Sequence, residues 1–271
     1  MTIKAAPTNL SRVWIMTMRL RWTVISSIVW IGLITNGHAT PPNTLREKAT
    51  VRSAPEQTPT TLSASQAIEK LRDGNTRFMH GKPLHPHEKA DWRSLLEDGQ
   101  HPFAVVLGCA DSRVPPELIF DQGFGDLFVI RVAGNVVDTD VIASVEYAID
   151  HLETPLLVVM GHTHCGAVSA TVDLLSDTKG EAAEVVSLLY RIEPAVMQLD
   201  PALPREAKIE AAIRKNVELA VRRLSRVPDL RRQVLADSIK ITGAVYDMHT
   251  GKVQFIDDVS KGADGSSTNR K

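Results

Sequence analysis

The sequence predicts an α/β fold built on a central, largely parallel sheet of four or five strands that is flanked by helices. Three short runs rich in Val, Ile, Leu and Phe are predicted to be strands, at residues 103–108, 127–133 and 155–161. A helical pattern at residues 141–152 separates the second run from the third, and another at residues 165–175 follows the third. This alternation of strand and helix is typical of βαβ units, in which consecutive strands run parallel.

The first predicted element is a helix that begins after Ser63. Ser63 and Gln66 form a capping-box pattern, in which each side chain accepts a hydrogen bond from the other residue's backbone N–H. The apolar residues of this segment recur at the spacing of one helix face: Ala64, Ala67, Ile68 and Leu71. The pattern therefore predicts an amphipathic helix before the first strand.

The three apolar runs lack the alternation of a half-buried strand, so we expect them to be buried on both faces of the sheet. A long amphipathic helix follows them, and its apolar face consists of Ile209, Ile213, Val217, Ala220 and Leu224. Residues 238–257 alternate and turn near Thr250–Gly251, which predicts a further strand and hairpin at the edge of the sheet.

Residues 1–39 have the pattern of a secretory signal peptide, which is removed from the mature protein. Basic residues precede an apolar run at residues 22–35, and the small residues Gly37 and Ala39 follow at positions that a signal peptidase recognises. The run has 14 residues, fewer than the roughly 20 that span a bilayer. We therefore expect a periplasmic or otherwise exported bacterial protein without stable membrane insertion. An uncleaved anchor at residues 22–35 is the alternative.

The rest of the chain is predicted to form one domain between two disordered segments. Residues 40–61 are rich in Pro and Thr, and residues 259–271 are rich in Ser and Gly, so we expect a linker and a tail around a domain at residues 62–258. Hydrophobic residues make up 43% of the chain, which is enough for a substantial core. The formal net charge of -1 argues against a nucleic-acid partner, because such binding needs a basic surface.

Metal-binding side chains follow two of the predicted strands. Cys109 comes directly after the first strand, and His162 and Cys165 follow the third. The carboxyl ends of parallel strands meet at one edge of a sheet, so we expect the three side chains to lie close together. Two thiolates and one imidazole form a ligand set typical of zinc, and three protein ligands leave a fourth position open, as in catalytic zinc sites.

Two alternatives stay open for these residues. The chain has two cysteines, which would form a disulfide in an oxidising compartment, although His162, Asp111 and Arg113 would then have no role. His164 is the alternative imidazole. It is closer to Cys165 in sequence but lies further past the strand end, and for this reason we favour His162.

Asp111 and Arg113 lie two and four residues after Cys109, so in an extended segment the three side chains point to the same side. As a fourth zinc ligand, Asp111 would close the site. In a bidentate pair with Arg113, it would instead leave the site open to water. A plain Asp–Arg brace within the loop is the purely structural alternative.

The motifs around these residues resemble those of the β-class carbonic anhydrases. The resemblance lies in CADSRVPPE (109–117) and GHTHCGA (161–167), with RVAGN (131–135) and SVEYAIDHL (144–152) between them. It covers roughly residues 62–257, which is nearly all of the patterned sequence. The paired cysteine and histidine motifs are far more specific than a lone pair of metal ligands.

The resemblance assigns zinc to Cys109, His162 and Cys165 and makes Asp111 and Arg113 a catalytic dyad beside the metal. It implies a largely parallel sheet, an N-terminal helical arm that embraces the neighbouring subunit, and a homodimer as the minimum assembly, with tetramers frequent. The expected reaction is the zinc-dependent, reversible hydration of carbon dioxide to bicarbonate and a proton, by attack of zinc-bound hydroxide.

The resemblance also implies a pocket for carbon dioxide at a dimer interface. By motif position, Gln100, Phe128 and Tyr147 correspond to residues that line this pocket. Some bacterial members bind bicarbonate at an inhibitory site that needs a tryptophan three residues before the first zinc cysteine. This sequence has Val106 at that position, so we do not expect the inhibitory site here.

Two other functions stay open from the sequence. In the first, the chain is a non-catalytic scaffold stabilised by zinc, with Asp111 as a permanent fourth ligand. In the second, it is a related hydrolase that acts on a sulfur analogue such as carbon disulfide, which would require a narrowed entrance to the site.

Overall fold

The structure is a computed structural model, and it describes residues 62–174 and 182–256. The predicted signal peptide, linker and tail lie outside the described residues. Among the described residues, no helix combines the length and the apolar character that a membrane-spanning segment needs.

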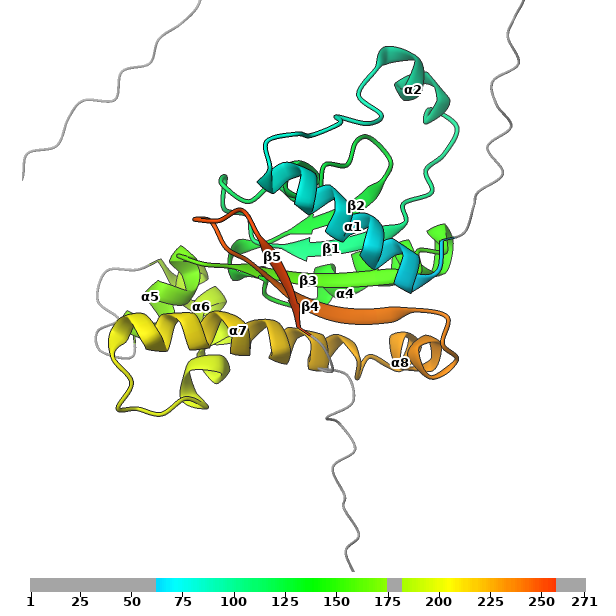
Figure 1. Ribbon diagram of the computed structural model, residues 1–271. Helices are drawn as coiled ribbons and strands as arrows, with labels where there is room; N and C mark the ends of the chain where they lie inside the picture. The colour runs from blue at the N-terminus through cyan, green and yellow to red at the C-terminus, as the bar shows by residue number, and fades with distance from the viewer. Residues whose placement is uncertain (1–61, 175–181, 257–271) are drawn as a thin grey trace, which may run out of the picture. The chain divides into compact units, whose positions relative to one another are not determined.

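Five strands form one sheet in the order β2-β1-β3-β4-β5 (Figure 1). Strands β2, β1, β3 and β4 run parallel to their neighbours, and β5 runs antiparallel to β4. The strands are β1 Ala104–Gly108, β2 Leu127–Arg131, β3 Leu156–His162, β4 Lys240–Tyr246 and β5 Val253–Ile256. The predicted largely parallel sheet with a C-terminal edge hairpin is confirmed.

Helices connect the strands and cover the sheet. The α-helices are α1 Ala64–Met79, α2 Ala90–Leu95, α3 Pro116–Ile119, α4 Thr139–Leu152, α5 Gly166–Leu174, α6 Ala183–Met197, α7 Arg205–Leu224 and α8 Pro228–Leu235. A single 3-10 turn, η1 Ala133–Asn135, follows β2. The helices predicted near residues 64, 141–152, 165–175 and 209–224 correspond to α1, α4, α5 and α7.

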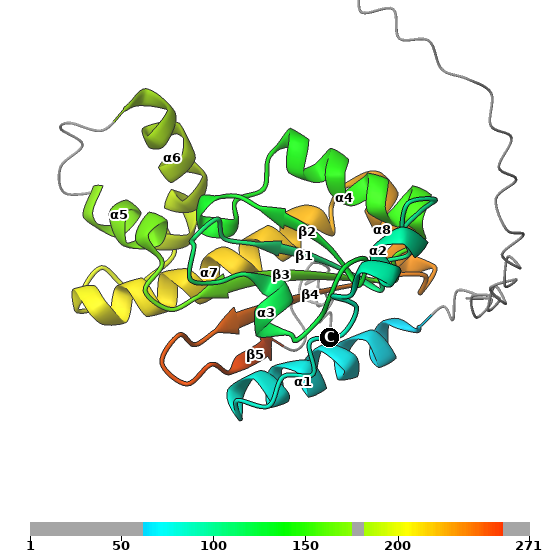
Figure 2. The ribbon, with the colours of Figure 1, turned by 90° about the horizontal axis from the view of Figure 1, so that it is seen from above.

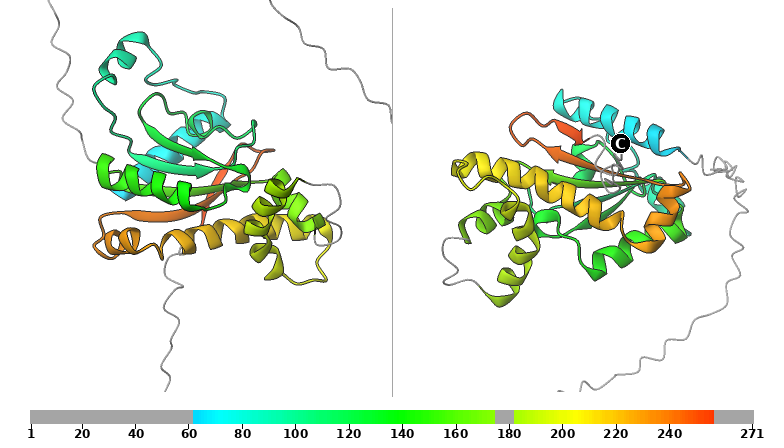
Figure 3. Two further views of the ribbon diagram at one scale, coloured as in Figure 1. Left: turned by 180° about the vertical axis from the view of Figure 1, so that it is seen from behind. Right: turned by 90° about the horizontal axis from the view of Figure 1, so that it is seen from below.

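Two apolar clusters cover opposite faces of the sheet, because alternate residues of a strand point to opposite sides. Val106 and Val158 belong to one cluster with residues of α1 and α3. Val105 and Val159 belong to the other with residues of α4, α7 and α8. In Figures 2 and 3, α1 lies on one side of the sheet and α4, α7 and α8 lie on the other.

Burial on both faces holds for two of the three predicted strands. Every residue of β1 and β3 is buried. In β2 the first four residues are only half-buried and Arg131 is exposed, so the expectation of full burial is wrong there. The reason is position, because β2 forms one edge of the sheet and pairs only with β1.

The first helix begins as the capping-box pattern predicts. The Gln66 N–H donates to Ser63 Oγ at 3.3 Å, and the Ser63 N–H donates to Gln66 Oε1 at 2.8 Å. The apolar face of α1 lies on the chain's own core, with Ala67 and Leu71 completely buried. Contact of this helix with a neighbouring subunit stays a prediction.

A buried carboxylate, Asp121, ties α1 to the segment that follows it. The Asp121 side chain is 1% exposed and accepts a 2.6 Å hydrogen bond from Arg77 Nε. It also accepts hydrogen bonds from the backbone N–H groups of Leu84 and His85. Burial alone raises the pKa of this carboxyl, but the donors from Leu84, Arg77 and His85 outweigh burial and hold the pKa below its usual value.

We expect Asp121→Asn to lower the free energy of unfolding by about 2–3 kcal/mol at pH 7, because an amide cannot satisfy all three donors. Because the pKa of Asp121 is depressed in the folded protein, the stabilisation by its carboxylate is complete above about pH 4. This stabilisation is lost as the pH falls further. Urea unfolding between pH 3 and 7 measures this. Asp229→Asn, in the exposed pair with Arg232, is the control and should have almost no effect. An equal loss in both variants would contradict the prediction.

Candidate active site

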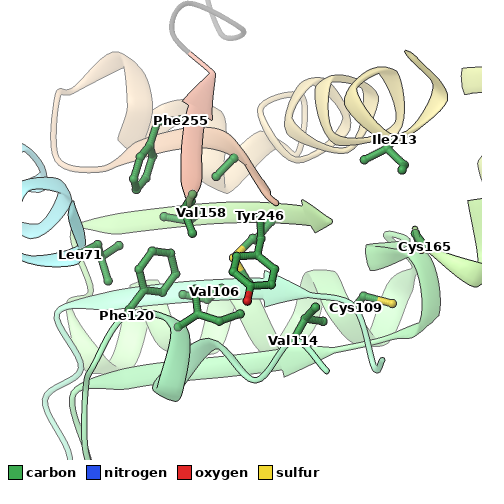
Figure 4. Packing of buried hydrophobic residues seen from close by; sticks show 14 of the residues in the cluster. Leu71, Val106, Cys109, Val114, Phe120, Val158, Cys165, Ile213, Tyr246 and Phe255 are labelled. Atoms are coloured by element: carbon green, nitrogen blue, oxygen red, sulfur yellow. The ribbon is translucent and has the colours of Figure 1, made fainter. Parts of the chain in front are cut away.

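The carboxyl ends of β1 and β3 bring the two cysteine motifs together. These strands are parallel neighbours, and Gly108 pairs with Met160, so Cys109 lies level with the end of β3. The ligand atoms of Cys109, His162 and Cys165 all lie within 4.8 Å of one another. All three residues are buried, and Figure 4 shows Cys109 and Cys165 at the same end of the core.

The imidazole of His162 is oriented for a ligand. Its Nδ1 donates a hydrogen bond to the carbonyl oxygen of Thr163 at 2.9 Å, so the lone pair is on Nε2. The Nε2 atom is buried and has no hydrogen-bond partner among the described residues. His164, the alternative imidazole, is exposed and does not belong to the cluster of ligand atoms. The structure thus brings His162 and not His164 to the two sulfurs.

The two sulfurs are not bonded to each other, so the disulfide alternative is absent from this structure. The side-chain hydrogen bond from Cys165 lowers the pKa of Cys109, burial opposes this effect, and the N–H of Gly134 lowers the pKa further. The same hydrogen bond, together with burial, raises the pKa of Cys165. Two adjacent thiolates repel each other, and a divalent cation between them would stabilise the ionised form of both.

Asp111 is held by Arg113 and does not join the cluster of ligand atoms. Arg113 Nε donates to Asp111 Oδ1 at 2.9 Å, and Nη2 donates to Oδ2 at 2.8 Å. The hydrogen bonds from Arg113 hold the pKa of the Asp111 carboxyl well below its usual range. Arg113 Nη2 also reaches the carbonyl oxygen of His164 at 3.3 Å, which links the two cysteine motifs. Of the two arrangements considered from the sequence, the structure has the open one, in which Asp111 pairs with Arg113 and does not join the candidate metal ligands.

Arg131, at the end of β2, holds the loop that carries Cys109 and Asp111. Its Nε donates to the carbonyl oxygen of Cys109 at 2.9 Å, and its Nη2 donates to the carbonyl oxygen of Asp111. Sequence reasoning did not assign Arg131 to the site. The signal that could have found it is a basic residue at the carboxyl end of the neighbouring strand, in the RVAGN motif.

The three residues predicted to line a substrate pocket are less buried than the three candidate metal ligands. Gln100 is exposed in the loop before β1, Phe128 is half-buried on β2, and Tyr147 on α4 is 50% exposed. The Phe128 and Tyr147 rings lie together, with centroids 6.3 Å apart. Gln100 has no described contact with either ring. Phe128 on the edge strand β2 and Tyr147 on α4 thus form a partly exposed aromatic pair.

Known proteins with similar sequences and structures identify the family. The sequence profile described as carbonic anhydrase matches residues 104–253. Carbonic anhydrase 2 of Mycobacterium tuberculosis is 38% identical over 195 residues, which cover 71% of this chain and 93% of that protein. A carbonic anhydrase of Mycolicibacterium smegmatis is 40% identical over 191 residues, which cover 70% of this chain and 91% of that protein.

A solved structure agrees with these relatives. The β-carbonic anhydrase CcaA aligns with a TM-score of 0.60 and 30% identity over 71% of this chain and 96% of that chain. The chain therefore belongs to the β-class carbonic anhydrase family.

Proposed function

We propose that this enzyme hydrates carbon dioxide reversibly to bicarbonate and a proton, with a zinc ion held by Cys109, His162 and Cys165. The observation that carries the proposal is the set of three buried ligand atoms within 4.8 Å of one another, directly beside the ionised Asp111–Arg113 pair.

The donor set fits zinc in three respects. Two sulfurs and one imidazole nitrogen are the ligand types of catalytic zinc sites with an open fourth position. His162 Nε2 is buried without a partner, which would be unfavourable unless a ligand satisfied it. The hydrogen bond from Nδ1 to the Thr163 carbonyl fixes the ring in the tautomer that leaves Nε2 free.

Zinc, when bound, supplies the Lewis acidity that lowers the pKa of water from about 15.7 towards 7 and so provides a nucleophile near neutral pH. Asp111 can accept the hydrogen of this nucleophile and direct its lone pair at carbon dioxide. Arg113 holds the carboxylate in place through two parallel hydrogen bonds and keeps it ionised. Since Arg113 engages Asp111, this carboxylate leaves the fourth position free, which favours an enzyme over a closed zinc scaffold.

We propose further that Gln100, Phe128 and Tyr147 line the carbon dioxide pocket and that a second copy of the chain completes it. The half-exposed Tyr147 ring and the half-buried Phe128 beside the edge strand support this, because a homodimer or tetramer would cover both. We also propose export through residues 1–39, with an anchor at residues 22–35 as the alternative to cleavage.

We expect the zinc-loaded protein to hydrate carbon dioxide at a rate that rises with pH from about 7 to 9. Two thiolates place more negative charge beside the ion than three imidazoles would, so they make water at this site less acidic. Asp111 does not cause the rise, because its depressed pKa keeps it ionised throughout this range. Stopped-flow measurement of hydration, with zinc content determined on the same sample, provides the test.

Carbon disulfide serves as the comparison substrate in that experiment. If the zinc-loaded protein did not hydrate carbon dioxide, the proposed function would be rejected. If it hydrolysed carbon disulfide and not carbon dioxide, the alternative of a hydrolase that acts on sulfur analogues would be favoured. A hydration rate that stays flat or falls between pH 7 and 9 would reject the argument that two thiolates make water at this site less acidic.

A further inference from the structure

The sulfur of Cys109 accepts a hydrogen bond from a backbone group that lies outside its own motif. The Gly134 N–H donates to Cys109 Sγ at 3.2 Å, and both residues are buried. Gly134 lies in η1 with φ 63° and ψ 21°, in the left-handed region that favours glycine. A Cβ added at Gly134 would lie 2.6 Å from Ile192 Cδ1, so a larger residue would not fit without movement.

The direction of this N–H depends on the backbone angles of a glycine, which has few intrinsic restraints on those angles. The N–H lies in the peptide plane between Ala133 and Gly134, so a rotation about φ of Gly134 would turn it away from the sulfur. A second contact restrains Gly134 from the opposite side of the residue. Asn216 Nδ2 donates to the carbonyl oxygen of Gly134 at 2.8 Å, across 82 residues of sequence.

Asn216 lies on α7, in the middle of the face that packs against the sheet. It is 5% exposed, and its neighbours on this buried face include Ile213, Val217 and Ala220. A buried amide is unfavourable there unless it is hydrogen-bonded, and the contact that it makes is the one with Gly134. Ile213, one turn before Asn216, shares the cluster that contains Cys109 and Cys165, and Figure 4 shows it over that end of the core.

We propose that Asn216 is a positioning residue for the metal centre, which acts through Gly134 on the sulfur of Cys109. The side chain fixes the carbonyl of Gly134, the glycine then keeps its left-handed conformation, and its N–H stays directed at the thiolate. The proposal rests on the proposed function, because it takes Cys109 to be a metal ligand.

The hydrogen bond at Cys109 has a defined electronic effect. An N–H that donates to a thiolate draws electron density from the sulfur and stabilises its lone pairs. Loss of the bond would raise the energy of those lone pairs and loosen the orientation of the sulfur. Substitution of such outer contacts typically weakens metal affinity or activity by about 10- to 100-fold.

Cobalt substitution provides a readout that is independent of activity. Thiolate ligands of Co²⁺ give charge-transfer bands in the near ultraviolet, whose energy follows the energy of the sulfur lone pairs. We expect Asn216→Leu to shift these bands to longer wavelength relative to the unaltered protein. We also expect the affinity for Zn²⁺, measured by competition with a chelator, to fall by about 10- to 100-fold.

The matched control is Val221→Ala, a completely buried residue on the same helix that belongs to a different apolar cluster from that of Cys109 and Cys165. This variant should lower stability and leave the cobalt bands unchanged. If Asn216→Leu does not fold, Asn216→Ala carries the same expectation. Folded Asn216 variants with the bands and the zinc affinity of the control would overturn the proposal. If the unaltered protein gave no thiolate bands with Co²⁺, the proposed metal centre itself would be rejected.

Discussion

Replacement of Cys109 by serine should remove bound zinc and nearly all hydration of carbon dioxide. The thiolate is the ligand form of cysteine, whereas a serine hydroxyl stays protonated near neutral pH and donates weakly to zinc. Structural zinc sites with four protein ligands bind with about 10–16 kcal/mol in total, so one ligand contributes about 2.5–4 kcal/mol. We therefore expect zinc affinity to fall by about 60- to 700-fold, since 1.4 kcal/mol is tenfold.

Zinc content after dialysis and the hydration rate of the same sample measure this effect. Val106→Ala is the control, because Val106 is completely buried on β1, three residues before Cys109, and supplies no ligand. It should lower stability and retain one zinc ion per chain. Cys165→Ser should behave as Cys109→Ser does. A Cys109→Ser protein that keeps both its zinc and its rate would exclude this cysteine as a ligand.

The sheet and the cluster of ligand atoms were predictable because both follow from short apolar runs that alternate with helical patterns along the chain. Once residues 103–108 and 155–161 are taken as neighbouring parallel strands, their carboxyl ends must lie together. Cys109 and His162 come at those ends, so their proximity does not depend on any loop. The structure bears out this geometry with all three ligand atoms within 4.8 Å.

The contacts around the ligands were not predictable, because no local pattern encodes them. Arg131 lies 22 residues from the Cys109 carbonyl that it holds, and Asn216 lies 82 residues from Gly134. Asn216 left one trace in the sequence, a polar residue among the apolar positions of a long helix. A polar residue at such a position indicates that its side chain has a buried hydrogen-bond partner. The identity of that partner depends on how α7 crosses the ends of the strands.

Short helices were missed for a different reason. Helices α2 and α3 have 6 and 4 residues, too few to display a helical period. Proline at the first position marks the start of both α3 and α8, at Pro116 and Pro228, and was the available signal. The half-buried state of β2 could not be read from its composition, because its run of Leu, Phe, Val and Ile is as apolar as the runs of the central strands.

We expect Asp111→Asn to lower the hydration rate by about 10²- to 10³-fold while zinc content stays unchanged, within the range known for positioned acid–base groups. The asparagine side chain keeps the size of aspartate and loses its charge. Its Nδ2 would present hydrogens where the carboxylate accepts them, and its pairing with Arg113 would lose one of two charge-assisted hydrogen bonds. Since Asp111 lies outside the cluster of ligand atoms, zinc binding should not depend on it.

The chain contains a matched control for this substitution. Asp173 forms the same bidentate pair with Arg205, with distances of 2.7 and 2.6 Å, on an exposed surface of α5 and α7. Asp173→Asn removes the same charge from the same type of pair and should leave the hydration rate unchanged. A large loss in both variants would mean that the Asp–Arg pairs act through stability alone. Full activity in Asp111→Asn would reject a role for this carboxylate in the reaction, because the metal would then suffice without an acceptor beside it.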